Sequence, residues 1–181
     1  MIVIGDEDRS DKAQEIHQRQ LDRIEKRMEN AIKAAIKTLQ KNQKCWDLLS
    51  GGMASIDPVG LLKDSERLSF EIGDIFEESP GQVTSATTTV SLWSWVDIGN
   101  GAQQKQATAV DVTINELAGS FVSGGGDSQK MTILHEMGHA IYDLYGPSGS
   151  GLLSTDYAIQ PDKKDLKKSE ANTKKINEVC R

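Results

Sequence analysis

Apolar side chains recur at every third or fourth position over a long stretch near the start of the chain, with charged side chains between them. This spacing predicts an amphipathic helix that follows a capping pair, Ser10 and Asp11. The apolar stripe consists of Leu21, Ile24, Met28, Ile32, Ala35 and Leu39. The stripe is too short for a coiled coil, so we expect the helix to pack on the rest of the domain, after a flexible segment at residues 1–10. His17, near the start of this helix, is expected to face solvent.

The middle of the chain changes from helical spacing to a composition typical of strands. Leu61 to Phe70 has helical spacing, which Ile72 to Phe76 can extend. Val83 to Val96 is rich in Thr, Val and Trp and predicts a strand. Trp93 and Trp95 point to one face of that strand, and we favour a core position for them over a place in a substrate-binding wall.

Thr108 to Leu117 alternates apolar and polar side chains, which predicts a second strand with one apolar face. It comes shortly before the next predicted helix. Two interpretations of this strand remain open. It is either a simple strand within the sheet or an edge strand that pairs with an extended peptide by strand addition.

The next predicted helix carries His-Glu-Met-Gly-His, with its two histidines, His135 and His139, four positions apart. On a helix they project from one face, which suits two ligands of one metal ion. Apolar residues cover nearly all of the remaining helix surface, so we expect the helix to be buried. Polar side chains buried without partners are costly, and a metal ion supplies a partner. Because neutral imidazole nitrogens suit Zn²⁺, the pattern predicts a zinc site.

Glu136 directly follows the first histidine and points to a hydrolytic reaction. Zinc lowers the pKa of a water that it binds, and an adjacent glutamate can take the proton from that water. The resulting nucleophile can attack a peptide carbonyl. The motif therefore predicts peptide hydrolysis with Glu136 as the general base.

A catalytic zinc site takes a third protein ligand and keeps one position open. No histidine follows His139, and Tyr142 and Tyr145 stand where the extended metzincin pattern has glycine and histidine. The third ligand is therefore expected to be a carboxylate. The candidates are Asp143, Asp156, Asp162, Asp165 and Glu170. Asp143 lies about 12 Å from His135 along the same helix, too far to share its metal but able to support a histidine ring.

The composition limits the kinds of partner. The chain has 181 residues and a formal net charge of -6, with 27 acidic and 21 basic side chains, which argues against nucleic acid as the main partner. No apolar run is long enough to span a membrane, and residues 1–8 lack the features of a signal peptide. We expect one domain with a peptide or protein substrate and no membrane partner, either retained in the cell or cut from a larger exported chain.

The two cysteines, Cys45 and Cys180, have two possible states. In a reducing compartment both would be free thiols. The position of Cys180 beside the last residue favours a bridge instead, because the bridge would hold a segment that otherwise frays. Closing so long a loop is worth on the order of 4 kcal/mol.

Several segments together resemble a known group of bacterial domains. They are His-Glu-Met-Gly-His-Ala at residues 135–140, the Gly/Ser loop after it, Ile159-Gln160-Pro161-Asp162, Ser169-Glu170-Ala171-Asn172-Thr173, the late Cys180, and more weakly residues 44–49. This set is similar to the metallopeptidase domains at the C-termini of bacterial RHS-repeat and related polymorphic-toxin proteins. The similarity covers about the last 50 residues well, whereas the middle of the chain is not distinctive.

The resemblance implies a zincin fold, a disulfide between Cys45 and Cys180, and Asp162 as the third zinc ligand. Asp156 is the alternative by similarity to aspzincins, although the Gly-Thr-x-Asp step of that group is absent. Glu170, on a following helix, would be the choice typical of gluzincins. Tyr142, Tyr145 and Tyr157 are candidates for stabilising the oxyanion, with Tyr157 placed in a mobile loop.

We therefore expect a single α+β zincin-like domain over residues 11–181. It would contain a long N-terminal helix, a small twisted and mostly antiparallel sheet, the metal-binding helix and a C-terminal helix. Its expected function is zinc-dependent peptide hydrolysis, and it is expected to act as a monomer. We expect it outside the cytoplasm, as part of a larger bacterial protein. An inhibitory or immunity protein is a further expected partner. The alternative is a binding module that keeps zinc for structure only, in which a fourth protein ligand closes the site.

Overall fold

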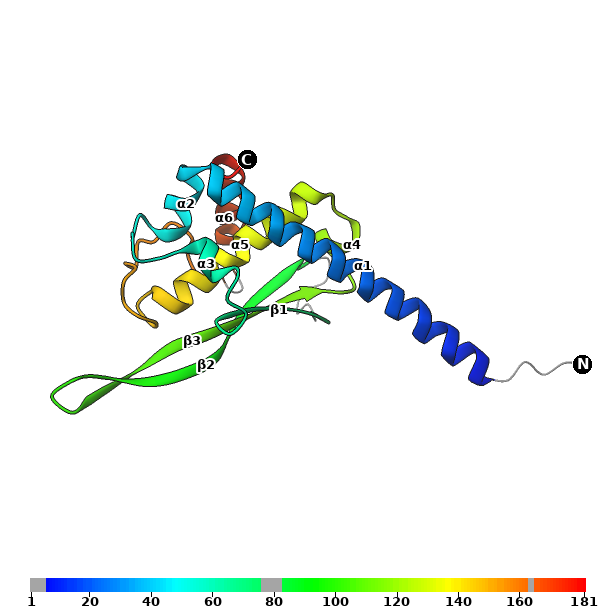
Figure 1. Ribbon diagram of the computed structural model, residues 1–181, viewed down its shortest axis with the longest axis horizontal. Helices are drawn as coiled ribbons and strands as arrows, with labels where there is room; N and C mark the ends of the chain where they lie inside the picture. The colour runs from blue at the N-terminus through cyan, green and yellow to red at the C-terminus, as the bar shows by residue number, and fades with distance from the viewer. Residues whose placement is uncertain (1–5, 76–82, 163–164) are drawn as a thin grey trace, which may run out of the picture.

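The computed structural model describes residues 6–75, 83–162 and 165–181, which form six helices and three strands. The helices are α1 (Asp6–Lys41), α2 (Gln43–Ser50), α3 (Pro58–Leu61), α4 (Ser120–Ser123), α5 (Gly126–Tyr145) and α6 (Leu166–Val179). The strands are β1 (Leu68–Gly73), β2 (Ala86–Gly99) and β3 (Ala102–Asn115). The helices gather on one side of the small sheet, while the start of α1 and the end of the β2–β3 hairpin extend away in opposite directions (Figure 1). The expected α+β class is confirmed.

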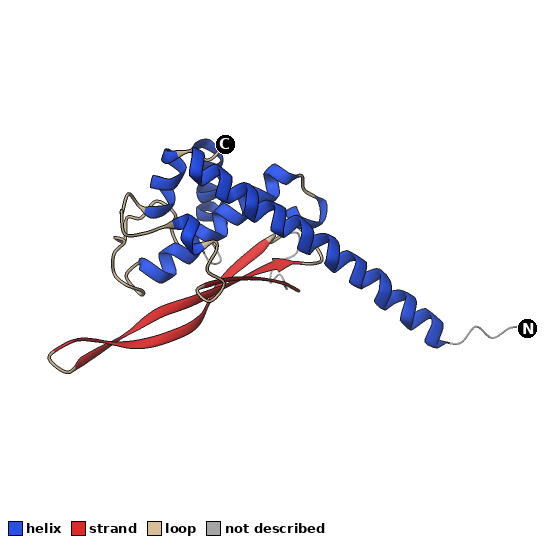
Figure 2. Cartoon of the chain, viewed as in Figure 1, coloured by secondary structure: helices blue, strands red, loops and turns tan. Residues whose placement is uncertain are grey.

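Helix α1 has the predicted apolar stripe. Ile24, Ala31, Ala35 and Leu39 are buried at steps of seven, four and four residues, and they pack into the common core. The helix begins at Asp6, before the expected capping pair, and residues 1–5 lie outside the described residues. Residues 11–19 are exposed, so the first described turns of α1 project from the body as a helical arm (Figure 2). His17 faces solvent as expected, and its Nε2 lies 3.7 Å from a carboxylate oxygen of Glu116.

The sheet is mixed, not mostly antiparallel. Its strand order is β1-β3-β2, with β1 parallel and β2 antiparallel to β3. The strand expected at residues 108–117 is confirmed as part of β3. Its interpretation as an edge strand is wrong, because β3 is paired on both sides. Among the described residues, β2 pairs only with β3, so β2 is the edge strand next to α5.

Strand β1 replaces the second predicted helix. The prediction of a helix over residues 61–70 is wrong, because α3 ends at Leu61 and Leu68 to Gly73 pairs with β3 instead. Cross-strand hydrogen bonds support this pairing, with the Ser69 hydroxyl donating to Asp111 at 2.6 Å. Apolar residues in so short a run fit either structure, and the long-range pairing with β3 decides between them.

The β2–β3 hairpin is longer than expected and carries exposed apolar side chains. Its two-residue turn, Asn100-Gly101, has φ values of 57° and 76°, which match the tight turns that suit twisted hairpins. Trp95 is 67% exposed and Trp93 38% exposed, so the prediction of core positions is wrong. The reason is that this part of the hairpin extends beyond the helices that bury the rest of the sheet (Figure 1).

Helix α5 lies at the centre of the fold, in contact with α1, the sheet and α6. Val110, Val112 and Ile114 of β3 are fully buried in the same core as Ile133 and Ile141 of α5. No helix within the described ranges is long and apolar enough to cross a membrane. The core therefore fixes α5 on several sides at once.

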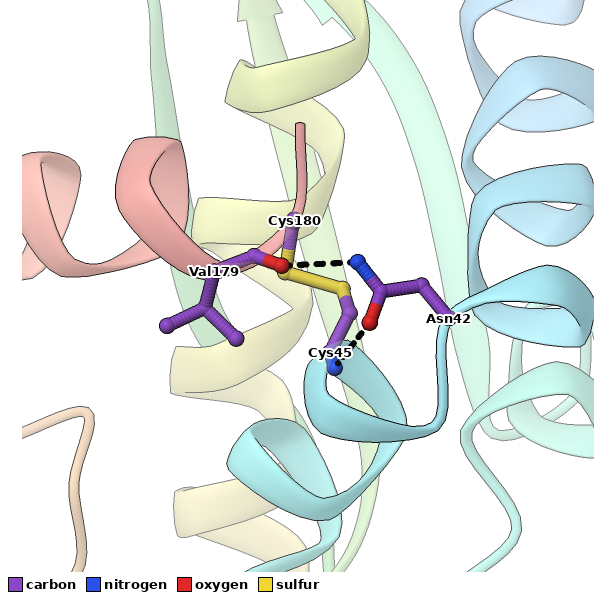
Figure 3. Close-up of a disulfide and its surroundings, with 4 residues drawn as sticks. All are labelled: Asn42, Cys45, Val179 and Cys180. Carbon is purple, nitrogen blue, oxygen red and sulfur yellow. Dashed lines mark hydrogen bonds between the residues drawn. A yellow bond between two sulfur atoms is a disulfide. The ribbon is translucent and has the colours of Figure 1, made fainter.

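A disulfide joins α2 to the end of α6. Cys45 and Cys180 are separated by 135 residues and their sulfur atoms are bonded, which bears out the bridge favoured for them. Asn42 supports the same junction, because its Oδ1 accepts from the Cys45 amide at 3.1 Å and its Nδ2 donates to the Val179 carbonyl at 2.7 Å (Figure 3). The end of α6 is thus tied covalently and by hydrogen bonds to α2.

We expect the change Cys180→Ser to lower the free energy of unfolding by about 2–5 kcal/mol, because the open chain gains the entropy of a long loop when it unfolds. Urea unfolding of the oxidised protein measures this loss. Cys45→Ser and the double variant serve as controls and should cost the same as the single change. A Cys180→Ser protein as stable as the oxidised wild type would show that the bridge contributes nothing.

Candidate metal centre

Helix α5 holds His135, Glu136 and His139 in a rigid, buried setting. His135 is 9% exposed and Glu136 is 7% exposed, and both lie on a helix whose aliphatic side chains fill the core. The two imidazole rings lie 4.8 Å apart between centroids. The local spacing in the sequence is therefore enough to bring the two histidines to one place.

Asp162 reaches the histidines through a close approach of the return segment to α5. An added Cβ on Gly138 would lie only 2.7 Å from Cγ2 of Ile159, so a glycine is needed where the segment crosses the helix. Ile159 is fully buried at this crossing. Three residues later the chain places the Asp162 carboxylate against the two histidine rings.

Three donor atoms meet at this point. His135 Nε2 lies 3.0 Å from His139 Nε2, and Asp162 Oδ2 lies 3.3 Å and 3.2 Å from these nitrogens. In a tetrahedral site with bonds of 2.0–2.1 Å, ligand atoms stand about 3.3 Å apart. Three electron-rich atoms this close repel one another unless they share a proton or a cation. Their identity and spacing therefore fit a zinc ion.

The electrostatics of these residues also suit a cation. Burial raises the pKa of Asp162, but hydrogen bonds from His135 and His139, the charge of His139 and a hydrogen bond from Asn172 hold it well below its usual range. Burial lowers the pKa of His139, but the hydrogen bond to Asp162 and neighbouring negative charges raise it overall. The carboxylate thus stays ionised, which is the form that binds a metal.

Helix α6 supports the centre with two polar residues whose role the sequence did not predict. Thr173 Oγ1 lies 3.1 Å from His135 Nδ1, so Nδ1–H donates to it when Nε2 faces the centre. Asn172 is 4% exposed and its Nδ2 donates to Asp162 Oδ2 at 3.1 Å and to the Gln160 carbonyl at 2.9 Å. No local sequence pattern marks either role, because the burial of Asn172 and both contacts depend on how α6 packs against α5.

Strand β2 contributes the partner of Glu136. The hydroxyl of Thr88 donates to Glu136 Oε2 at 2.7 Å and lies 3.3 Å from the Glu136 carbonyl. This bond joins the edge strand to the middle of α5 and fixes one carboxylate oxygen of the expected general base. No local sequence pattern marks Thr88 for this role, because the contact spans 48 residues.

The other candidate ligands lie elsewhere. Asp156 and Glu170 are exposed, and the group of described residues that could hold a metal contains only His135, His139 and Asp162. Asp165 caps α6, since its side chain accepts from the Lys168 amide at 3.2 Å. The charge of Asp143 raises the pKa of His139, so this residue acts on the site through its field.

The tyrosines proposed for the oxyanion are engaged in packing. The Tyr157 hydroxyl donates to the Leu49 carbonyl, its ring stacks on Tyr142, and burial raises the pKa of the hydroxyl. At 4% exposure Tyr157 belongs to the core and not to a mobile loop. The Tyr145 ring lies under the guanidinium of Arg67. The Tyr157 hydroxyl is therefore committed to the core and does not fit the role of an oxyanion donor.

Comparison of this chain with protein family models, with curated proteins and with solved structures gives no match.

Proposed function

We propose that this protein is a zinc-dependent peptidase. His135, His139 and Asp162 would hold the metal, and Glu136 would act as the general base. The observation that carries this proposal is the meeting of three donor atoms within 3.0–3.3 Å of one another, beside a buried glutamate on the same helix. The same proposal includes a zincin-like fold and a relationship to the toxin-associated domains that the sequence resembles.

The number of ligands favours catalysis over a structural role. A structural zinc site takes four protein ligands, whereas a catalytic one takes three and leaves a position for water or substrate. Within the part of the chain that the structure describes, three residues place a ligand atom close enough to one another to share a metal ion. The alternative of a binding module with a closed zinc site has no fourth ligand among these residues.

Zinc bound at such a site supplies Lewis-acid chemistry, polarising a peptide carbonyl and making a coordinated water more acidic. Glu136 takes the proton from the attacking water and later gives it to the departing amine. Thr88 donates to one carboxylate oxygen of Glu136, which leaves the other oxygen to carry the proton. Thr173 and Asn172 hold His135 and Asp162 in position.

An extended peptide suits the surroundings of the site. Thr88 lies on β2, the edge strand beside α5, and unpaired backbone groups along such an edge can pair with an extended chain. The disulfide is consistent with a compartment outside the reducing cytoplasm. The edge strand supports a peptide substrate, and the disulfide supports secretion. The resemblance to exported effector domains supports both, and an immunity partner would restrain the activity of such a domain.

The proposal is tested by zinc content and hydrolysis together. We expect about one zinc per chain in wild type by elemental analysis, because three ligands converge. We also expect cleavage of unfolded casein that a chelator stops and added zinc restores. His139→Ala should lose both the zinc and the activity. The matched control is His17→Ala, which removes an exposed histidine of α1 and should keep both.

Two results would go against the proposal. A wild-type protein that binds no zinc when offered it would remove the metal centre altogether. Stoichiometric zinc without hydrolysis of casein or of a mixed peptide library would instead support the binding module.

A further inference from the structure

A groove lies between the C-terminal half of α1 and the start of α5, and its volume is about 790 Å³. It is lined by residues of the α1–α2 junction, of the first turns of α5, and by Arg181. None of the metal-centre residues lines it. A volume of this size is in the range of sites that hold ligands, and nothing in the proposed hydrolysis uses it.

The charge of the groove is opposite to that of the chain. The protein as a whole has 27 acidic and 21 basic side chains. The groove is lined by five basic side chains and one acidic side chain, which are Lys37, Lys41, Lys44, Lys130, Arg181 and Asp127. Asp127 is itself paired with Lys130 at 3.3 Å. The remaining four cations give this surface a net positive field on an acidic protein.

Small side chains of α1 line the groove beside its lysines, and we call Ala31, Ala34 and Thr38 its floor. Ala34 and Thr38 lie four residues apart on α1, and Lys37 and Lys41 repeat the same step beside them. Asn30 to Lys41 spans about 16 Å along the helix axis. A small inorganic anion would use one or two cations and no apolar floor, whereas a polypeptide segment can contact the whole length.

The disulfide junction builds one end of the groove. Lys44 and Arg181 are the chain neighbours of the two bonded cysteines, Cys45 and Cys180. Asn42, which also lines the groove, binds both sides of this junction by hydrogen bonds (Figure 3). Two of the five cations are therefore held next to a covalent link.

We propose that this groove docks an acidic segment of a partner polypeptide. The small side chains of α1 receive its apolar residues, and the surrounding lysines and Arg181 face its carboxylates. Complementary charge would steer the partner to this face and orient it there. The inference does not depend on the metal centre, so it can be tested with and without a chelator.

The test is fluorescence anisotropy with a labelled acidic peptide that carries leucine at helical spacing. We expect saturable binding that weakens with salt, and a Kd raised at least about tenfold by the double change Lys37→Glu and Lys41→Glu. The matched control, Lys12→Glu with Lys26→Glu, makes the same charge change at exposed positions of the same helix outside the groove. It should change the Kd less than about twofold.

A variant without charge change separates docking from general attraction. Ala34→Phe fills the floor of the groove and should weaken the peptide as well, while its far-ultraviolet spectrum stays that of wild type. Equal weakening by the two double variants, or an unchanged Kd in Ala34→Phe, would overturn the proposal. The proposal would also be overturned if tripolyphosphate or a short oligonucleotide displaced the labelled peptide at concentrations at which the unlabelled peptide does not displace it. An absence of saturable binding to wild type would overturn it as well.

Discussion

Changing Glu136 to Gln is expected to lower kcat/KM for peptide hydrolysis by at least about 10³-fold, or roughly 4 kcal/mol of transition-state stabilisation, without loss of zinc. Glutamine has the shape of glutamate and can still accept the hydrogen bond that Thr88 donates to Oε2. It cannot take a proton from water at neutral pH. The fold and the metal should therefore persist while the proton transfer is lost.

The comparison needs a second glutamate variant. Glu170→Gln changes an exposed residue of α6 that lies outside the group of candidate ligands, and it should leave both zinc content and kcat/KM within about twofold of wild type. Initial rates on a quenched fluorescent peptide, with zinc measured in the same samples, provide the readout. Full activity in Glu136→Gln would falsify the role of this carboxylate.

Asp162→Ala is expected to weaken zinc binding by at least about 100-fold, because it removes the proposed third ligand and not merely a supporting contact. Asn172→Ala removes the amide that donates to Asp162 Oδ2 at 3.1 Å. Its expected loss is smaller, about 10–100-fold, the range for partners that orient a ligand. Competition with a zinc-binding dye measures both.

Asp156→Ala is the matched control for this series. Asp156 is exposed and was the alternative third ligand, so its removal should leave zinc affinity unchanged. If Asp156→Ala loses zinc and Asp162→Ala retains it, the assignment of the third ligand is reversed. If neither variant loses zinc, the third ligand is another residue.

The parts of the fold that follow from local spacing were predictable. The helix that carries His135 and His139 and the alternating strand before it depend on neighbours along the chain, and both are present. Strand β1 was mistaken for a helix, since its six residues gain their strand pairing only from β3, about 40 residues later. Short apolar runs leave this choice open.

Burial was harder to predict than secondary structure. Trp93 and Trp95 are aromatic residues in a strand, and such residues are usually covered. Whether a strand is covered depends on how far the helices extend over it, which no pattern within the strand encodes. The exposed end of the hairpin is the result.

The candidate metal centre also combines residues that local spacing predicts with residues that only tertiary folding brings together. The two histidines and Glu136 follow from one helix, whereas Asp162 was named through resemblance and not through any spacing rule. Thr88, Asn172 and Thr173 were not foreseen, because tertiary folding brings them to α5 from distant segments. Supporting contacts of this kind cannot be found before the packing of the helices is known.

Oxidation of the two cysteines can give two products, a bond within one chain or a bond between two chains. The two cysteines within these 181 residues allow one bond between them, so wrong pairing within this stretch cannot occur. The competing product is a covalent dimer. In an unfolded chain the 135-residue separation makes encounter of the two thiols infrequent, whereas docking of α6 beside α2 raises their effective concentration. Folding before oxidation therefore favours the monomer, and oxidation of crowded, unfolded chains favours the dimer.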